Sequence, residues 1–356
     1  MDVKTKEPLA FVNIGVLDKG LGTVSDEGGR FHLDLDASRI ADNDLIQFSF
    51  LGYASQSVSV SDVPLDQEGY VDVFMEPAPM ELDEAVVSSS LPVPISESVG
   101  YKNYGELIFG YWKDDKALGG EMATLIKVNE AKRQLKQLQF KVFRNLADSV
   151  LVRVNFYGPD PKNGAPGQHL NRSGKEVFQI LSGKDKDVVI DLTPFDIFVH
   201  NDFFVSLELL KVHGEGQFEL ALAGADNHSP TYKRYVSQDK WKTLGAIPIA
   251  LSLQTDVYVS QAKAQRHQKK VERVRARKRM VSGFTIHRGQ MVGNVNVLNR
   301  RTGESVQSDD RGRYELHAKR NDILYFTKEG YQRLFVEIQK EDFVNAPMKK
   351  ENGTSP

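Results

Sequence analysis

The chain contains no cysteine among its 356 residues. This absence excludes disulfide bonds, thiolate zinc sites and catalysis by a thiol. Long apolar runs are also missing, since no stretch approaches the roughly 20 consecutive apolar residues that cross a bilayer as a helix. Hydrophobic residues make up 40% of the chain and charged residues 26%, which is typical of a globular protein. We therefore expect two or three domains, each with its own core.

Motifs of the common enzyme classes are absent as well. None of the eight histidines lies within four residues of another or has a glutamate three residues later, whereas a zinc peptidase needs His and Glu at metal-ligand spacing. There is no Gly-x-Ser-x-Gly elbow and no phosphate-binding Gly-x-x-x-x-Gly-Lys-Ser/Thr loop. We therefore expect no catalytic residues, no metal and no cofactor. A hydrolase that uses carboxylates outside these motifs is a less favoured alternative.

What the sequence does contain is an internal repeat. Two pairs of segments are similar, at offsets of 283 and 278 residues: 24–33 with 307–316, and 44–53 with 322–331. In each copy an Asp-x-x-Gly-Arg turn precedes an aromatic residue, Phe31 or Tyr314. Asp can cap such a turn and Gly accepts its positive φ, so the aromatic residue is expected to begin an inward-facing strand. The repeat predicts two copies of one antiparallel sandwich of about seven strands.

The first copy lacks a counterpart for the beginning of the second. The alignment places Met1 opposite Phe284, so that Val281–Gly283, which read as the start of a strand, have no equivalent. An open strand position leaves backbone groups of a sheet unpaired. We therefore expect that the natural chain begins earlier and that a targeting segment preceded this domain.

The middle of the chain has a different texture. Runs such as Val150–Phe156 alternate as half-buried strands do, and Gly/Pro/Asn-rich turns separate them. They predict a jelly-roll-like sandwich of eight or more strands. The fold class is therefore all-β, with three sandwich domains in series. The expected boundaries are 1–77 for the first sandwich, 78–99 for an extended linker, 100–260 for the central sandwich, 261–280 for a basic helical linker, 281–350 for the second copy and 351–356 for a tail.

The charges are unevenly distributed. Residues 1–90 hold 17 acidic and 5 basic residues, whereas residues 261–350 hold 10 acidic and 21 basic ones. Opposite charges would favour a salt-sensitive contact between the acidic N-terminal and basic C-terminal domains, within one chain or between chains. The alternative is that both surfaces are simply solvated.

A basic run extends from Lys263 to Arg279, with nine Lys and Arg residues and one acidic residue. Such a run is typical of a solvated helix or a linker. An anionic surface is an alternative partner for it. Nucleic acid is not expected, because no aromatic residues interleave with the charges to stack on bases.

The repeated block carries a recognisable pattern, composed of Pro8-Leu9, Val12–Ile14, Thr23–Phe31 and Phe50–Tyr53. This pattern resembles the carboxypeptidase-regulatory-like domain, a transthyretin-like β-sandwich of envelope proteins in Gram-negative bacteria. The second copy has Met291-Val292 in place of Pro-Leu and is identified as a divergent member. The segment Leu82–Val87 is similar to the one that follows this domain in outer-membrane nutrient receptors, although the chain is too short to hold their plug and barrel.

The resemblance implies a non-catalytic role in the periplasm or on the outer-membrane surface. We therefore expect a binding or scaffold protein of the cell envelope, with the central sandwich as the recognition domain and an envelope protein or a glycan as its partner. The alternative is a carbohydrate-binding accessory protein of an outer-membrane glycan-uptake system.

Aromatic side chains are the candidates for ligand binding, because flat rings stack on sugars or hold a peptide. The candidates are Tyr101, Tyr104, Tyr111, Trp112 and Trp241. Trp241 is flanked by polar residues and is expected to be partly exposed. Core packing is the alternative role for both tryptophans.

Overall fold

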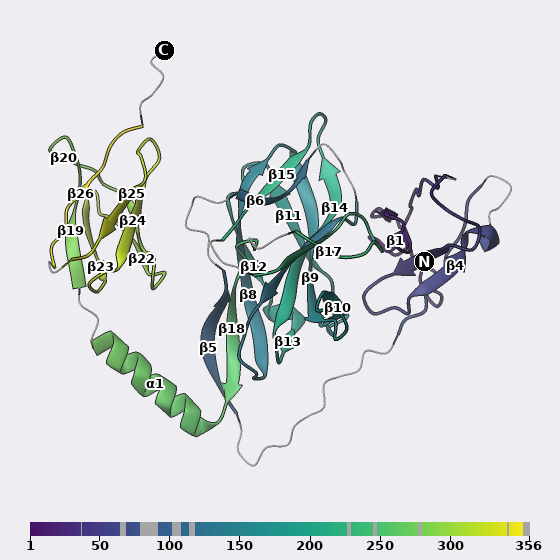
Figure 1. The fold of residues 1–356 in the computed structure, drawn as a ribbon, viewed down its shortest axis with the longest axis horizontal. Helices are drawn as coiled ribbons and strands as arrows, with labels where there is room; N and C mark the ends of the chain where they lie inside the picture. The colour runs from purple at the N-terminus through teal and green to yellow at the C-terminus, as the bar shows by residue number, and fades with distance from the viewer. Residues whose placement is uncertain are drawn as a thin grey trace. The chain divides into compact units, whose positions relative to one another are not determined.

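The computed structural model describes residues 1–36, 38–64, 69–78, 92–101, 108–113, 118–225, 229–244, 248–276, 280–339 and 342–351. Strands provide nearly all the regular structure of these residues, which confirms the all-β class. The chain divides into two compact units, Met1–Gln261 and Ala262–Pro356. The first unit contains the first copy of the repeat and the central sandwich, and the second contains the second copy (Figure 1).

The first copy forms one antiparallel sheet of four strands in the order β2-β1-β3-β4. Its elements are β1 (Asn13–Val16), β2 (Leu21–Val24), β3 (Leu45–Ser49), β4 (Gln56–Ser59) and the 3₁₀ helix η1 (Val60–Asp62). Apolar side chains that alternate along the strands form its core: Ile14, Val16, Ile46 and Phe48 are all buried.

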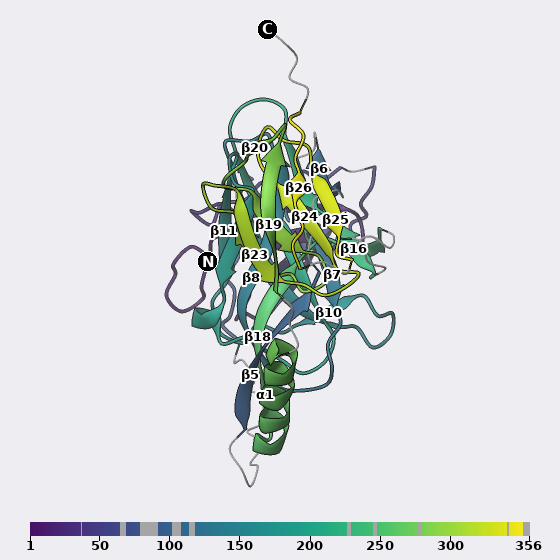
Figure 2. The same cartoon turned by 90° about the vertical axis from the view of Figure 1, so that its left-hand side faces the viewer.

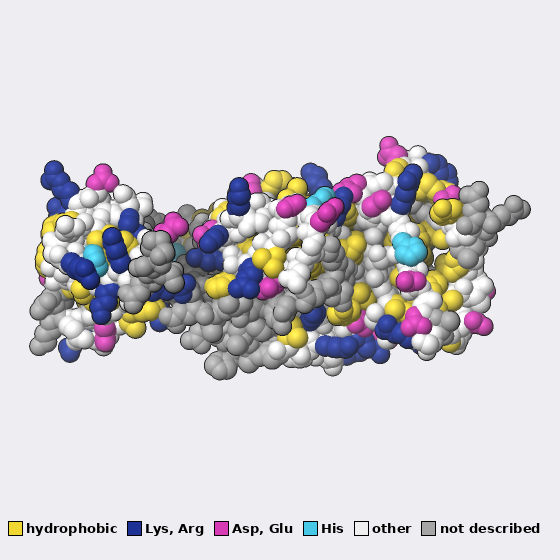
Figure 3. Space-filling view, turned by 90° about the horizontal axis from the view of Figure 1, so that it is seen from above, with side chains coloured by type: hydrophobic (Ala, Val, Ile, Leu, Met, Phe, Trp, Pro, Cys, Tyr) yellow, Lys and Arg dark blue, Asp and Glu magenta, His cyan; other side chains and the backbone are white. Residues whose placement is uncertain are grey.

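The second copy forms two four-stranded sheets. The first sheet contains β20-β19-β23, with β26 paired in parallel to β19, and the second has the order β22-β21-β24-β25. The strands are β19 (Met280–His287), β20 (Gln290–Met291), β21 (Asn296–Asn299), β22 (Ser305–Gln307), β23 (Arg313–His317), β24 (Ile323–Thr327), β25 (Leu334–Glu337) and β26 (Ala346–Pro347). On the face shown in Figure 3, Lys and Arg side chains predominate over this unit.

The repeat seen in the sequence is also a repeat in structure. Equivalent residues pair in the same register: Asn13 with Val24 and Ser49, and Asn296 with Gln307 and Thr327. In the predicted turns the carboxylate of Asp26 accepts hydrogen bonds from two backbone N–H groups at 2.8 Å, and that of Asp309 accepts the equivalent pair at 2.8 and 2.9 Å.

The aromatic residues after these turns also have equivalent surroundings. Phe31 meets Phe48 edge-on at 5.7 Å between ring centroids, and Tyr314 meets Phe326 edge-on at 5.2 Å. In the turns before them, Gly29 and Gly312 both have φ of 73°, which favours glycine. The predicted turn is therefore present in both copies, and in each the aromatic residue after it faces the core, but only Tyr314 lies in a strand.

The first copy differs from the predicted seven-stranded sandwich. In the second copy Tyr314 of β23 pairs with Gly283 of β19, but the alignment places no residue of this chain opposite Met280–Gly283. Residues 30–34, the counterpart of β23, form no strand. The β-rich composition of residues 70–75 also predicts a strand, but of these residues only Met75 forms a β-bridge, with Asp2.

The central sandwich contains the fourteen strands β5 to β18 of the described residues, in two seven-stranded sheets. One sheet has the order β10-β9-β14-β7-β16-β17 with β11 beside β9, and the other has the order β5-β18-β8-β15-β6 with β12 and β13 beside β8. Several neighbouring strands, such as β9 and β14 or β5 and β18, are far apart in sequence, as in Greek-key sandwiches. Buried side chains of both sheets, such as Phe156, Leu207, Leu138 and Leu253, form one core between them.

The bounds of the central strands and of the 3₁₀ helix η2 are as follows: β5 (Val93–Gly100), β6 (Ile108–Lys113), β7 (Glu121–Ile126), β8 (Arg133–Asn145), β9 (Ser149–Pro159), β10 (Pro166–His169), β11 (Val177–Ser182), β12 (Asp187–Asp191), η2 (Thr193–Phe195), β13 (Phe198–Val199), β14 (Phe203–His213), β15 (Glu219–Ala223), β16 (Thr231–Arg234), β17 (Lys242–Thr243) and β18 (Ser252–Val259).

Both expected linkers differ in part from the structure. Residues 93–99, expected in the extended linker, belong to β5, which pairs with β18 along its whole length. The basic segment does form a helix, α1 (Gln261–Ala276), which begins directly after β18 (Figure 2). Its described side chains are mostly exposed, as expected for a solvated helix.

Candidate functional site

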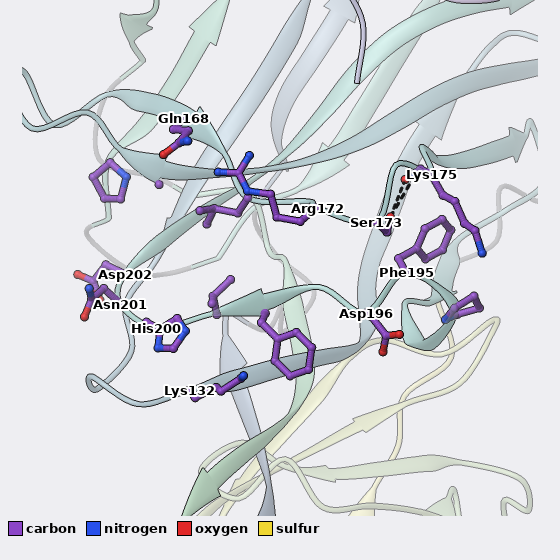
Figure 4. A pocket seen from close by; sticks show the side chains of 16 residues that line it. Lys132, Gln168, Arg172, Ser173, Lys175, Phe195, Asp196, His200, Asn201 and Asp202 are labelled. Atoms are coloured by element: carbon purple, nitrogen blue, oxygen red, sulfur yellow. Dashed lines mark hydrogen bonds between the residues drawn. The ribbon is translucent and has the colours of Figure 1, made fainter. Parts of the chain in front are cut away.

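A partly open cleft in the central sandwich is a candidate concave site of the described residues. Its volume is about 800 Å³, within the range of about 300–1,000 Å³ that small-ligand sites occupy. It lies between the loops around β10, the segment from η2 to β14 and the residue that precedes β8 (Figure 4). Its polar and aromatic lining comprises Lys132, Gln168, Arg172, Ser173, Lys175, Phe195, Asp196, Phe198, His200, Asn201 and Asp202.

A buried asparagine fixes the loop that carries two of the cations. The Asn171 carboxamide accepts hydrogen bonds from the backbone N–H of Ser173 at 2.9 Å and from its hydroxyl at 2.7 Å. Its amide donates to the carbonyl of Lys175 at 2.8 Å. Because Asn171 is 1% exposed and closes this turn, Arg172 and Lys175 are held at the mouth of the cleft.

The opposite wall is set by a short helix and a tight turn. Helix η2 ends at Asp196, which has the left-handed φ of 46° that Asp tolerates better than most residues. The chain then enters β13, where Phe198 pairs with Gln134 of β8. The Lys132 ammonium lies 4.7 Å from the centroid of the Phe198 ring, so a cation and an aromatic ring stand together at this wall.

The acidic and basic side chains of the cleft differ in their partners. Asp196 accepts a hydrogen bond from the Gln134 amide at 2.9 Å, and Asp202 accepts one from the Val128 backbone N–H at 2.7 Å. Both carboxylates thus help to hold the cleft wall. The three cationic side chains, Lys132, Arg172 and Lys175, form no ion pair with any described residue.

A second polar cluster, the Arg153 network, lies on the outward face of the sheet that contains β9, β14 and β7. The Arg153 guanidinium contacts Glu208 at 2.9 Å and Glu176 at 2.8 Å. It also donates to the Phe11 carbonyl at 2.9 Å and to the Asn13 side chain at 2.8 Å, both in the first copy. One buried arginine therefore joins the first copy to the central sandwich.

The network continues across the same sheet face. Arg234 contacts Glu121 at 2.5 Å, and the Asn155 amide donates to both Glu121 and Glu208 at 2.9 and 2.8 Å. The Tyr157 hydroxyl donates to Glu121 at 3.1 Å. Glu121 and Glu208 are fully buried, so these hydrogen bonds replace water around their carboxylates.

Burial and the paired charges act in opposite directions on the pKa values of this network. Burial by itself raises the pKa of Glu208, but Arg153 and Arg234 outweigh it and lower the pKa. For Arg153, Glu208 and Glu176 outweigh the lowering by burial and raise the pKa. Burial and the nearby Arg153 lower the pKa of His169 to about 4, so that this ring is neutral at pH 7. At pH 7 the arginine side chains of the network are therefore charged, and the neighbouring His169 ring is uncharged.

Close backbone packing completes the contact of the first copy with the central sandwich. A Cβ atom on Gly15 would lie 2.4 Å from the Ser237 carbonyl oxygen, and one on Gly22 would lie 2.5 Å from it. Only glycine permits this approach. Phe11 and Phe178 add an aromatic contact at 5.4 Å.

The aromatic candidates whose side chains the structure describes, Tyr101, Trp112 and Trp241, lie in different surroundings. Tyr101 and Trp112 are buried in the core between the two sheets, so the core-packing alternative describes Trp112. Tyr104 lies outside the described residues, and Tyr111 lies in β6. Trp241 is partly exposed, as expected, and packs against Tyr157 and Arg234 at 6.1 and 5.0 Å. A ligand-binding role for Trp241 stays a prediction.

Sequence reasoning missed the residues that line the cleft. The available signal was local: Asn171–Lys175 is a polar, Gly-containing loop with two cations, and Pro194–Asp202 combines aromatic and polar residues between strands. Loops on a rigid scaffold often carry binding residues. The sequence does not show that these two segments line the same cleft. Their positions are set by the way in which β9 and β8 pair with other strands.

No group of three or more His, Asp or Glu side chains in the described part of the chain is placed to hold a metal ion. No helix among the described residues combines the length and apolar character needed to span a bilayer.

Comparison with protein families identifies the N-terminal domain. Residues 1–87 match the family model of the CarboxypepD_reg-like domain. The chain therefore carries a carboxypeptidase-regulatory-like domain at its N-terminal end, as the motif pattern predicted. The match covers the first copy alone, and membership of the second copy in this family stays a prediction. No curated protein matches the chain in sequence.

Solved structures resemble the chain only weakly. The cysteine protease and lectin-like domains of Cwp84, a surface-layer-associated protein of Clostridium difficile, are 10% identical with a TM-score of 0.29. That match covers 70% of this chain and 59% of the other, so the chain spans less than two thirds of its length. The VP2 subviral particle of infectious bursal disease virus is 12% identical over 75% of this chain and 69% of the other, with a TM-score of 0.24. Scores this low support no functional inference.

Proposed function

We propose that this protein is a non-catalytic binding protein whose central sandwich recognises a ligand in the cleft. The main support for this proposal is the cleft, because its three cationic side chains form no ion pair with any described residue and can contact a ligand. Its walls are set by a buried asparagine and by strand pairing, which is the arrangement of a preformed binding site. The carboxypeptidase-regulatory-like domain supports a binding or scaffold role.

We also propose a location in the periplasm or on the outer-membrane surface. The N-terminal domain supports it, since the motif pattern resembles that of envelope proteins. Contact between the acidic first copy and the basic second copy is a further prediction, and sedimentation velocity at low and high salt tests it. Equal sedimentation coefficients and association states at both salt concentrations would remove that contact from the proposal.

A carbohydrate-binding role is the second candidate function. Phe195 and Phe198 line the cleft, as do the amide groups of Gln168 and Asn201, and a cleft with both aromatic rings and hydrogen-bonding groups suits sugars. In this role the protein would serve glycan uptake as an accessory rather than as an enzyme.

Blocking the cleft tests the proposed function. Gln168 is exposed at the cleft, so Gln168→Trp fills part of it without disturbing the core. Lys162→Trp, on an exposed loop outside the lining, is the matched control. The full-length chain and both variants are applied to arrays of glycans and of peptides. We expect Gln168→Trp to lose the ligands that the control retains, and equal binding by both variants would refute the cleft as the site.

A further inference from the structure

The cationic side chains of the cleft identify the chemical class of its ligand. We propose that the cleft binds an acidic oligosaccharide, one that carries carboxylate or sulfate groups on its sugar rings. This inference rests on the proposed function, because it takes the cleft to be the ligand site, and it adds the charge and type of the ligand.

The charges of the lining favour an anion. Three cations, Lys132, Arg172 and Lys175, face two carboxylates, Asp196 and Asp202. Each carboxylate already accepts a hydrogen bond from the protein, whereas the cations have no ion-pair partner among the described residues. A ligand anion would supply that partner, and a hydrogen bond to a charged group contributes about 1.5–3 kcal/mol.

The positions of the cations indicate where ligand charge would lie. Figure 4 shows Arg172 on the wall formed by the loop after β10, and Lys132 on the opposite wall. A guanidinium can hold a carboxylate or sulfate through two parallel hydrogen bonds. With cations on both walls, the cleft suits a ligand that bears more than one acidic group.

The aromatic residues distinguish a saccharide from other anions. The Lys132 ammonium lies 4.7 Å from the Phe198 ring centroid, so an acidic group bound by Lys132 would stand next to an aromatic face. In an acidic sugar the charged group is attached directly to a ring whose C–H face can pack on an aromatic ring. A free phosphate or sulfate ion would use the cations but not Phe198 or Phe195.

The amide side chains and the shape of the cleft also favour a saccharide. Gln168 and Asn201 both line the cleft and can exchange hydrogen bonds with sugar hydroxyls. The cleft is partly open, so a chain of sugars can extend beyond it. An acidic peptide would satisfy the cations equally well, and the test therefore includes one.

Isothermal titration calorimetry of the full-length chain tests the inference. The probes are a tetramer of galacturonic acid, the matching tetramer of galactose and a tetramer of glutamic acid. The two saccharides have the same ring and differ at C6, where one bears a carboxylate and the other a hydroxymethyl group. The protein variants are Arg172→Gln, which removes a cleft cation, and Lys162→Gln, which removes an exposed cation outside the cleft. An array of sulfated and neutral oligosaccharides extends the comparison.

We expect the acidic tetramer to bind at least about tenfold more tightly than the neutral one, with an affinity that falls as salt is added. Arg172→Gln should reduce this affinity about tenfold and leave the weak binding of the neutral tetramer unchanged. Lys162→Gln should have no effect on either saccharide.

The other outcomes separate this inference from the proposed function. Equal binding of neutral and acidic saccharides, lost on Gln168→Trp, would overturn the acidic ligand and keep the cleft as a binding site. Preference for the glutamate tetramer would overturn the saccharide and keep the binding function. Binding of acidic saccharides that Arg172→Gln and Gln168→Trp leave intact would overturn this inference and the proposed site together. The absence of cleft-dependent binding across the arrays would likewise overturn both this inference and the proposed site.

Discussion

Replacing Arg153 with methionine should weaken the first unit substantially. The Arg153 guanidinium is 3% exposed and contacts two carboxylates, Glu208 and Glu176, at 2.9 and 2.8 Å. It also donates to the Phe11 carbonyl and the Asn13 side chain of the first copy. Methionine fills much of the same space but removes the hydrogen bonds of the guanidinium to these four acceptors.

The expected magnitude follows from burial. Removing one partner of a buried ion pair costs about 3–5 kcal/mol, because the remaining charge is buried without compensation. Glu208 is fully buried, so water cannot replace the guanidinium there. With a urea m-value of about 3 kcal/mol/M, this loss shifts the unfolding midpoint by about 1–2 M.

Tryptophan fluorescence in urea measures this change in the full-length chain. Both tryptophans, Trp112 and Trp241, lie in the central sandwich, so their emission reports on the first unit. Arg144→Met is the matched control, since Arg144 is 54% exposed and its pair with Glu219 is 3.3 Å long. An exposed pair of this kind contributes about 0–1 kcal/mol.

A midpoint shift for Arg153→Met no larger than that of Arg144→Met would refute the reasoning. It would mean that water reaches the acceptors of Arg153 in the folded state. The double variant Arg153→Met, Glu208→Leu provides a second check. Replacing both members of a buried pair by apolar side chains is often nearly neutral, so the double variant should be more stable than the sum of the two single changes predicts.

Three further predictions concern the contact between domains and the response to pH. Gly15→Leu should separate the first copy from the central sandwich, because the new Cβ would lie 2.4 Å from the Ser237 carbonyl oxygen. Leucine is the residue at the equivalent position of the second copy. Limited proteolysis should then release the first copy faster than from Ser57→Leu, whose position is exposed; equal rates would contradict the packing. The pKa of His169 is about 4 in the folded state and about 6.5 when the chain is unfolded. Stability that is present above pH 6.5 is therefore lost as the pH falls towards 4, because only the unfolded state binds the proton in this range. Between pH 7 and pH 5 the first unit should lose about 2 kcal/mol in urea titrations, and His169→Gln should remove this loss; an unchanged pH dependence in the variant would exclude His169 as its source. In the second unit, burial raises the pKa of Asp322, but Arg301, Asn299 and the Lys319 N–H outweigh it and lower the pKa to about 2. The stability that this carboxylate contributes is present above pH 4 and is lost as the pH falls towards 2. Asp322→Asn should therefore destabilise the second unit by about 2 kcal/mol at pH 7 and by far less at pH 2, and hydrogen exchange of β21 and β24 measures this difference. Equal destabilisation at both pH values would contradict the lowered pKa.

Local features of the fold could be read from the sequence because their causes are local. The turns at Asp26 and Asp309 need a side-chain acceptor and a glycine at fixed spacing, and the sequence contains both. The alternation of Val150–Phe156 places a strand that the structure has as part of β9. The basic composition after Gln261 predicts a solvated helix, and α1 is one.

The failures of sequence reasoning have a common physical origin. Residues 70–75 are rich in β-formers, but a strand needs a neighbouring strand to pair with, and of these residues only Met75 forms a β-bridge. The segment 93–99 contains proline and serine, yet it pairs with β18 because that strand exposes an edge. Trp112, for which ligand binding and core packing were both open, packs in the core. Pairing and burial depend on residues distant in the chain, which composition does not reveal.

The same alternation that located β9 gave the wrong environment for its polar residues. Arg153 and Asn155 alternate with core residues, and such positions normally face water. Here the first copy and the segment after β16 cover that face, so both side chains are buried and hydrogen-bonded. No pattern within β9 encodes the presence of a neighbouring domain.

The sequence by itself determined the repeat, the turns, the all-β class and the family of the N-terminal domain, because each follows from residue types at short, fixed spacings. Only the tertiary structure decided which polar residues are buried in the Arg153 network and which converge on the cleft. Arg172 and Lys132 are separated by 39 residues in the chain and line one cavity, since strand pairing rather than sequence order sets their positions.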